Sequence, residues 1–183
     1  NNNDIISNWI SEKDNGIFDA FNKGIALSSG DIIGILNSDD FYTNKNVISN
    51  VIKAFSDYEV DSVYGNLLYT DPVNTNIIKR KWIDNTPYDR NRFKYGWMPA
   101  HPTFYCKKDI YDRLGGYNDS FKIGGDFELC LRFLEINNVP SFGAYITFDY
   151  WASVRRDVTL TGIPRSIFLV DTQNVTIDAP IYP

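Results

Sequence analysis

The sequence DIIGILNSDDFY, residues Asp31–Tyr42, joins a hydrophobic run directly to a polar group. Ile32–Leu36 are all apolar or glycine, and Asn37–Asp40 follow without a spacer. An apolar run of this length predicts a strand buried on both faces, as in a parallel sheet. Open α/β sheets bind ligands at the carboxyl ends of such strands. Because the adjacent carboxylates of Asp39 and Asp40 repel each other, we expect a metal ion, a basic group or solvent to offset them.

Helical and extended patterns alternate around this predicted strand. A helix is expected over Ile17–Leu27, where apolar residues recur at helical spacing. Its predicted buried stripe consists of Ile17, Ala20, Phe21, Gly24 and Leu27. Another helix is expected from Val47 to Phe55, and Ile5–Ile10 is predicted to form a short first strand. The order strand, helix, strand, helix predicts an α/β fold.

The rest of the chain continues in the same manner. Extended patterns occupy residues 61–70, 77–83, 103–106 and 141–154, and helices are expected at Asp109–Leu114 and from Asp126 onward. Residues 84–100 contain prolines and several aromatic residues, which predicts a loop that lies over a site. The sequence shows no repeat and no long linker, so we expect one domain over residues 1–183.

Composition and charge narrow the class of protein. The chain has 183 residues, of which 43% are hydrophobic and 15% aromatic, which indicates a globular protein with a real core. Its net charge of −5 argues against a nucleic-acid partner. Basic residues cluster at Lys79–Lys81, Arg90–Arg92 and Lys107–Lys108. Each cluster is either a solvated face or an anion-binding site.

Cysteine usage and hydropathy indicate a compartment. Cys106 and Cys130 lie in apolar stretches and match no metal-binding spacing, so we expect buried free thiols in a reducing environment. No apolar run approaches the roughly 20 residues that span a membrane, and no signal peptide is visible. These features predict a cytoplasmic location, with the cytoplasmic face of the membrane as the other expectation.

Two acidic sites are the first candidates for chemistry. Asp39 and Asp40 offer the carboxylate oxygens that Mg²⁺ and Mn²⁺ prefer, and Mg²⁺ commonly joins one or two carboxylates to substrate phosphates. The alternative is an ordinary loop dipeptide. Asp126 follows two glycines at an expected helix start. It is either a helix N-cap or a carboxylate kept ionised as a general base.

Other polar residues allow two interpretations each. Asp19, Asn22 and Lys23 share one face of the helix at Ile17–Leu27, so they converge on one partner or form a solvent-exposed face. His101 is the single histidine and lies between Ala100 and Pro102. One histidine alone indicates neither a catalytic triad nor a zinc site.

Two long motifs resemble one enzyme family. SEKDNGIFDAFNKGIALSSGDIIGILNSDDFY, from Ser11 to Tyr42, closely resembles family 2 glycosyltransferases of the GT-A fold, with the pattern S-E-x-D-x-G-I-[YF]-D-A-x-N-K-G-I followed by G-D-x-I-x-x-L-N-[SA]-D-D. HPTFYCKKDIYDRLGGYNDSFKIGGDFELCLR, from His101 to Arg132, is similar to the acceptor half of that family. The resemblance spans about residues 7–135, and residues 141–183 form a C-terminal tail of unclear role.

The resemblance implies a fold and an activity. The expected fold is a Rossmann-like, partial GT-A sheet with helices on both faces. The expected activity is inverting transfer of a sugar from a nucleotide-diphosphate sugar, UDP-linked, to a hydroxyl of a saccharide or lipid-linked acceptor, as in bacterial surface polysaccharide synthesis. Mn²⁺ or Mg²⁺ is the expected cofactor. Peripheral association with the inner membrane is a further expectation.

The resemblance also implies roles for individual residues. Asp126 corresponds to the catalytic base, and Asp39 to the main metal ligand, with Asp40 as the second. His101 matches a position near the acceptor and the donor sugar. Arg132 is assigned to the same sugar-binding group and is expected to support the helix that carries Asp126. The residues implied to bind the nucleotide sugar are Asp14, Asp19, Asn22, Lys23, Asn37, Ser38, Asp39 and Asp40.

One departure from the family pattern keeps other functions open. Family members usually carry two further strands before this region, so a first βαβ unit of about 30 residues is expected to be absent. The strand at Ile5–Ile10 would then be an exposed edge, which predicts self-association. The alternative functions are a truncated, non-catalytic binding module of the same fold and a metal-dependent phosphohydrolase.

Overall fold

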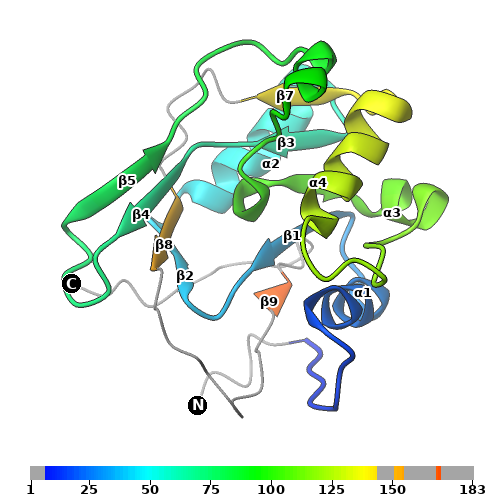
Figure 1. The fold of residues 1–183 in the computed structure, drawn as a ribbon, viewed down its shortest axis with the longest axis horizontal. Helices are drawn as coiled ribbons and strands as arrows, with labels where there is room; N and C mark the ends of the chain where they lie inside the picture. Colours follow the sequence, from blue (N-terminus) through cyan, green and yellow to red (C-terminus); the bar gives the residue numbers. More distant parts are fainter. Residues whose placement is uncertain (1–6, 144–150, 155–167, 170–183) are drawn as a thin grey trace.

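The computed structural model describes residues 7–143 and the strand residues 151–154 and 168–169 (Figure 1). In chain order, the elements are α1 (Ile17–Leu27), β1 (Ile32–Leu36), β2 (Asp40–Tyr42), α2 (Val47–Tyr58), β3 (Ser62–Tyr64), β4 (Leu67–Thr70), β5 (Ile78–Trp82), η1 (Arg90–Tyr95), η2 (His101–Thr103), β6 (Tyr105–Lys107), α3 (Lys108–Leu114), α4 (Gly125–Cys130), η3 (Leu131–Ile136), β7 (Ser141–Gly143), β8 (Trp151–Val154) and β9 (Phe168–Leu169). Here η1 and η2 are 3₁₀ helices, and η3 is a π-helix.

The strands form two sheets of mixed direction. The larger sheet has the order β7-β3-β6-β1-β9, and the smaller one β2-β8-β4-β5. β3 runs parallel to β7, but β1 pairs antiparallel with both β6 and β9. The prediction that β1 lies in a parallel sheet is therefore wrong for the strands that the structure describes. An apolar run indicates that a strand is buried on both faces, but it does not indicate the direction of the neighbouring strands.

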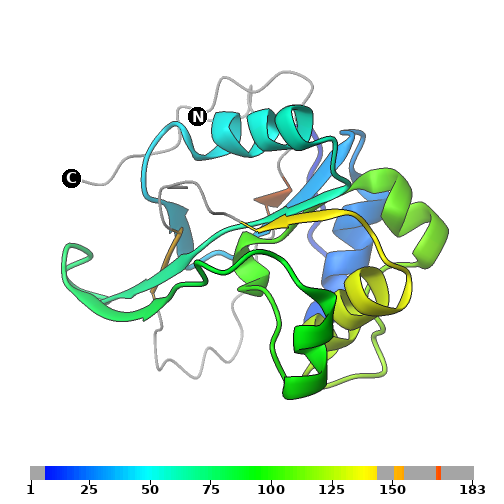
Figure 2. The ribbon, with the colours of Figure 1, turned by 90° about the horizontal axis from the view of Figure 1, so that it is seen from above.

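Helices cover both faces of the larger sheet, as expected for a partial GT-A fold. Side chains along β1 alternate between two cores. Ile33 and Ile35 pack in the core built with α1, α3 and α4, whereas Ile32 and Leu36 pack against the core built with α2. Figure 2 shows α2 on one side of the sheet and α1 and α4 on the other. This double burial explains why the strand sequence is continuously apolar.

Helix α1 has the predicted bounds but buries a different stripe. Its buried residues are Phe18, Phe21 and Ile25, whereas Leu27 is exposed. Phe18 stacks on Tyr117, with ring centroids 5.5 Å apart and an interplanar angle of 8°. Phe18 and Ile25 are thus buried where Ile17 and Gly24 were predicted, a shift of one residue at each position. The shift follows from the packing of Phe18 on Tyr117, which lies far along the chain.

The predicted first strand is wrong in its described part. Residues 7–10 belong to no strand, and Trp9 and Ile10 are exposed. β9 pairs with β1 on the side away from β6, so β9 is the edge strand there. The exposed edge strand expected at Ile5–Ile10 is not found among the described strands. The extended pattern at residues 61–70 divides at Gly65 into β3 and β4, and the pattern at 141–154 contributes β7 and β8, with 144–150 outside the described residues.

Candidate functional site

The register of β1 against β6 places His101 at the polar end of β1. Because β1 and β6 are antiparallel, with Ile32 facing Lys107 and Gly34 facing Tyr105, the carboxyl end of β1 and the amino end of β6 lie at the same end of the pair. η2, which begins with His101 and ends just before β6, contacts β1 directly. Two segments that are far apart in sequence meet at this edge of the sheet.

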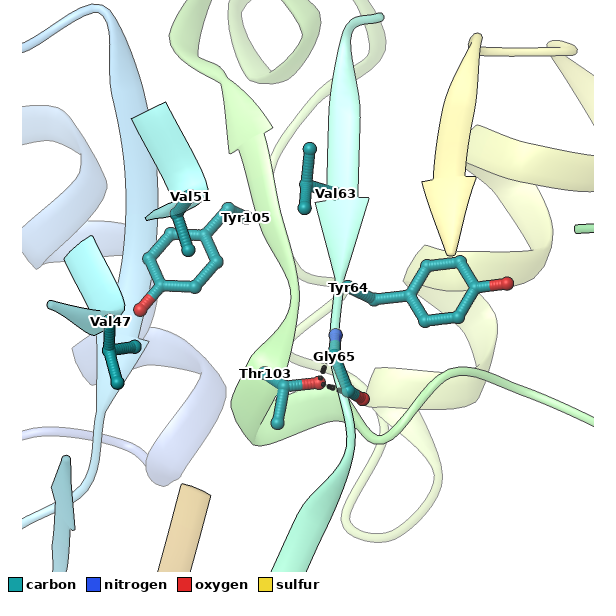
Figure 3. A pocket seen from close by; sticks show the side chains of 7 residues that line it. All are labelled: Val47, Val51, Val63, Tyr64, Gly65, Thr103 and Tyr105. Atoms are coloured by element: carbon teal, nitrogen blue, oxygen red, sulfur yellow. Dashed lines mark hydrogen bonds between the residues drawn. The ribbon is translucent and has the colours of Figure 1, made fainter. Parts of the chain in front are cut away.

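Thr103 holds η2 in this position. Its hydroxyl accepts a hydrogen bond from N of Gly65 at 3.0 Å and lies 2.9 Å from the carbonyl oxygen of Gly65 and 2.7 Å from that of Ala100. Figure 3 shows the two contacts with Gly65 at the end of β3, beside a hollow between α2 and the sheet. That hollow measures about 10 Å³, at most enough for one water, and is a packing gap in the core.

The turn after β1 presents one free acid. Asn37 donates a hydrogen bond from Nδ2 to Oδ2 of Asp40 at 2.8 Å, and N of Asp40 donates to O of Asn37 at 3.0 Å. These bonds close the turn around Ser38 and Asp39, which are both exposed. Among the described residues, nothing forms a hydrogen bond or an ion pair with the carboxylate of Asp39. The turn therefore offers this carboxylate outward.

The donors at this turn fit a hard divalent cation. Asp39 contributes an exposed carboxylate, and Asp40 adds a second carboxylate whose Oδ2 accepts a hydrogen bond from Asn37 and whose Oδ1 is buried. Among the described residues, no three or more histidine, cysteine, aspartate or glutamate side chains cluster so that they could hold a metal ion. Such a sparse set does not make a closed zinc site, but it suits Mg²⁺ or Mn²⁺ completed by phosphate oxygens and water.

Asp126 and His101 form the second part of the site. Oδ2 of Asp126 lies 3.8 Å from Nε2 of His101, and the two side chains are 24% and 39% exposed. α4 begins after Gly124, which adopts a left-handed conformation with φ of 82° and turns the chain into the helix. Burial raises the pKa of the Asp126 carboxyl, against the opposing effects of His101 and of the backbone N–H of Asp126.

Helix α1 packs directly against the start of α4. A side chain at Gly125 would lie 2.5 Å from the ring of Phe18, so only glycine permits this approach. Asn22 braces the same region, because its Nδ2 donates to O of Tyr117 and its Oδ1 accepts from N of Tyr117, both at 2.7 Å. The amide of Asn22 is thus engaged by the backbone and supports the fold beside Asp126.

The polar residues at the start of α1 form an ion-pair network. Lys23 Nζ lies 3.2 Å from Oδ2 of Asp19 and 2.9 Å from Oε1 of Glu12. Asp19 also accepts a hydrogen bond from N of Asn15, and this bond, followed by Lys23, lowers its pKa. Asp14 accepts from N of Gly16 at 3.0 Å and fixes the entry into the helix. The structure thus joins Asp19 and Lys23 in one network with Glu12, whereas Asp14 binds the backbone at the entry of α1.

Arg132 is bound entirely within the protein. It forms a salt bridge with Glu128 at 2.7 Å and donates to the carbonyl oxygens of Leu114, Gly115 and Gly116. These bonds tie α4 and η3 to the end of α3. The geometry supports the predicted bracing role, whereas contact of Arg132 with a sugar stays a prediction.

A cluster that sequence analysis missed orders residues 84–100. Oδ2 of Asp84 accepts hydrogen bonds from Nη1 of Arg92 and Nε1 of Trp97, both at 2.7 Å, and the guanidinium lies 4.2 Å from the Trp97 ring centroid. Phe93, within this segment, packs edge-on against Phe127 at 5.9 Å. The expected loop therefore contains a helical turn and packs against the helix that carries Asp126.

Fold and site together define an α/β domain with an acidic turn at the end of a central strand and a carboxylate–histidine pair beside it. The chain belongs to the family described as glycosyl transferase family 2, whose sequence model matches residues 6–123. The resemblance to family 2 is thereby confirmed. The match ends before Asp126, whose assignment rests on its position in the structure.

Individual relatives agree with this family. An uncharacterized glycosyltransferase of Mycobacterium tuberculosis is 30% identical over 130 residues, which cover 68% of this chain and 46% of that protein. A PGL/p-HBAD biosynthesis glycosyltransferase of Mycobacterium bovis is 25% identical over 122 residues, covering 66% of this chain and 44% of that protein. The chain thus spans less than half the length of these relatives.

Proposed function

We propose that the chain is the transferase domain of an inverting, metal-dependent glycosyltransferase. It moves a sugar, of hexosyl type, from a UDP-linked donor to a hydroxyl of a saccharide or lipid-linked acceptor, as in cytoplasmic steps of bacterial surface polysaccharide synthesis. The observation that carries this proposal is that η2 brings His101, and with it Asp126, to the same edge of the sheet as the turn Asn37–Asp40. Membership of family 2 supports it.

The acidic turn serves the donor. Asp39, with Asp40 as the second ligand, would hold Mn²⁺ or Mg²⁺, and the ion when bound neutralises the charge that develops on the leaving diphosphate. Asn37 and Ser38 are proposed to contact the ribose. Asp14, Asp19 and Lys23 line the nucleotide side, and Asn22 ties α1 to the backbone of Tyr117.

Asp126 serves the acceptor. Its carboxylate takes the proton from the acceptor hydroxyl while the hydroxyl oxygen attacks the anomeric carbon and the bond from that carbon to the diphosphate breaks. A raised pKa suits this role, because a general base works best when its pKa approaches the operating pH. A single displacement with inversion needs one base and no second carboxylate as nucleophile, in contrast to retaining glycosidases. His101 orients Asp126 and favours its ionised form.

A non-catalytic binding module is the second candidate. In that case the chain would bind the nucleotide without transferring a sugar. Release of UDP from a UDP-hexose in the presence of Mn²⁺ decides between the two functions. We expect release that Asp126→Asn abolishes, whereas binding of UDP without any release would support the module. The described residues hold no cluster of three or more metal ligands, so no observation favours the phosphohydrolase.

A further inference from the structure

The hairpin of β4 and β5 exposes hydrophobic residues at its tip. In Figure 1 and Figure 2 this hairpin extends away from the rest of the described chain. Val73 is 93% exposed, and Ile77 and Ile78 are each 46% exposed. Single exposed apolar residues are ordinary, but three within one turn form a local apolar surface.

Cationic side chains lie immediately beside this tip. Lys79, Arg80 and Lys81 are all exposed on β5, and the only acid in residues 67–83 is Asp71, which pairs with Lys79 at 3.1 Å. The hairpin is therefore positive in a chain whose net charge is −5. This separation of charge is what contact with an anionic surface requires.

The tip is held in one conformation. N of Asp71 donates to O of Ile77 at 2.9 Å, and its carboxylate accepts from N of Val73 at 2.9 Å and from N of Asn74 at 3.0 Å. Asn74 in turn accepts a hydrogen bond from N of Asn76. Because these bonds order the loop in advance, little conformational entropy remains to be lost when the tip binds.

At the base of the tip, the side chain of Arg80 lies over the rings of Tyr69 and Trp82. Its guanidinium lies 5.0 Å from the Tyr69 ring centroid and 6.0 Å from that of Trp82. A shallow hollow of about 220 Å³ is lined by Tyr69, Thr70, Pro72, Lys79 and Arg80. Two cations beside a small hollow suit a phosphate group, and tyrosine and tryptophan are the residues that favour a membrane interface.

We propose that the β4–β5 hairpin docks the protein on an anionic lipid bilayer. Val73, Ile77 and Ile78 enter the interfacial region, while Lys79, Arg80 and Lys81 contact lipid phosphates around them. A protruding apolar tip within a cationic collar matches a bilayer, where hydrophobic insertion and attraction to anionic headgroups add together. None of the described helices has the length and the apolar character of a membrane span.

Vesicle co-sedimentation of the full chain tests this proposal independently of nucleotide binding and sugar transfer. We expect binding to phosphatidylcholine vesicles that contain phosphatidylglycerol, weakening with added salt, and little binding to pure phosphatidylcholine. Lys79→Glu with Lys81→Glu leaves Arg80 on its aromatic partners and should reduce the partition coefficient at least about tenfold, since each basic residue contributes about fivefold. Val73→Ser with Ile77→Ser should also weaken binding but retain the salt dependence.

The matched control is Lys53→Glu with Arg113→Glu, which changes the net charge equally at exposed positions on α2 and α3. It should bind nearly as well as the unchanged chain. Equal loss in both charge variants would reduce the effect to overall charge and overturn the proposal. Unchanged binding in the hairpin variants, or no preference for phosphatidylglycerol, would overturn it as well.

Discussion

Nε2 of His101 lies 3.8 Å from Oδ2 of Asp126, across the gap between η2 and the first turn of α4. This separation is too long for a hydrogen bond but short enough for an electrostatic contact. Burial raises the pKa of Asp126, and His101 acts in the opposite direction. The imidazole is thus placed to control the protonation of the proposed base.

Replacing the histidine should shift the pH dependence of activity. His101→Gln removes the imidazole whose electrostatic effect lowers the pKa of Asp126, so the pKa of Asp126 should rise further. The acidic limb of the kcat/KM profile, where rate increases as Asp126 loses its proton, should then move to higher pH. A pH–rate series on the two proteins measures this shift. An unmoved acidic limb would mean that His101 does not act on Asp126.

Removing the base itself should affect turnover and leave donor binding nearly unchanged. Asp126→Asn keeps the shape of the side chain but cannot accept the acceptor's proton. We expect kcat to fall by at least about 10²-fold, with little change in donor KM. Asp109→Asn, at an exposed acid of α3, is the control and should be neutral. Near-normal turnover in Asp126→Asn would leave Asp126 as an acid in the first turn of α4 without a catalytic role.

The Asp84 cluster should make a measurable contribution to stability. Asp84→Ala leaves Arg92 and the indole N–H of Trp97 without their acceptor, so the free energy of unfolding should fall by about 2–3 kcal/mol. Denaturant unfolding measures this change, with the exposed Asp112→Ala expected to lie within about 0.5 kcal/mol of the unchanged chain. A loss no larger than that of Asp112→Ala would contradict the assigned contacts.

The same cluster sets a pH dependence of stability. Burial alone would raise the pKa of Asp84, but hydrogen bonds from Arg92, Thr86 and Trp97 outweigh it and lower the pKa in the folded state. The stabilisation is therefore present above the unfolded-state pKa of about 3.9 and is lost as the pH falls through the lowered value. Asp84→Asn should flatten this acidic loss in unfolding experiments. An equally steep loss in the variant would assign it to other carboxyl groups.

Local hydrophobic spacing was sufficient to predict the elements around the site. The bounds of α1 and β1 agree with the structure, because helical recurrence and a short apolar run are properties of contiguous residues. The buried face of α1 was misplaced because Phe18 stacks on Tyr117, far along the chain. Strand direction around β1 was also missed, since both faces are buried whichever way its neighbours run.

The candidate site was only partly predictable. Asp39 and Asp126 could be proposed from the residues and from the family resemblance, but the placement of His101 and Asp126 at the end of β1 that Asp39 follows depends on the pairing of β1 with β6. Asp84 gave no signal, because its partners Arg92 and Trp97 have no regular spacing from it. Long-range pairing, rather than residue type, is the information that the sequence lacked.

Calorimetric titration of UDP into the chain, with and without Mn²⁺, tests the central claim most directly. The unchanged protein should bind UDP in a Mn²⁺-dependent manner, and Asp39→Ala should abolish that dependence with an unaltered unfolding temperature, because Asp39 is exposed. Asp40→Ala should weaken binding less. Metal-dependent affinity that persists unchanged in Asp39→Ala would contradict the proposed donor site.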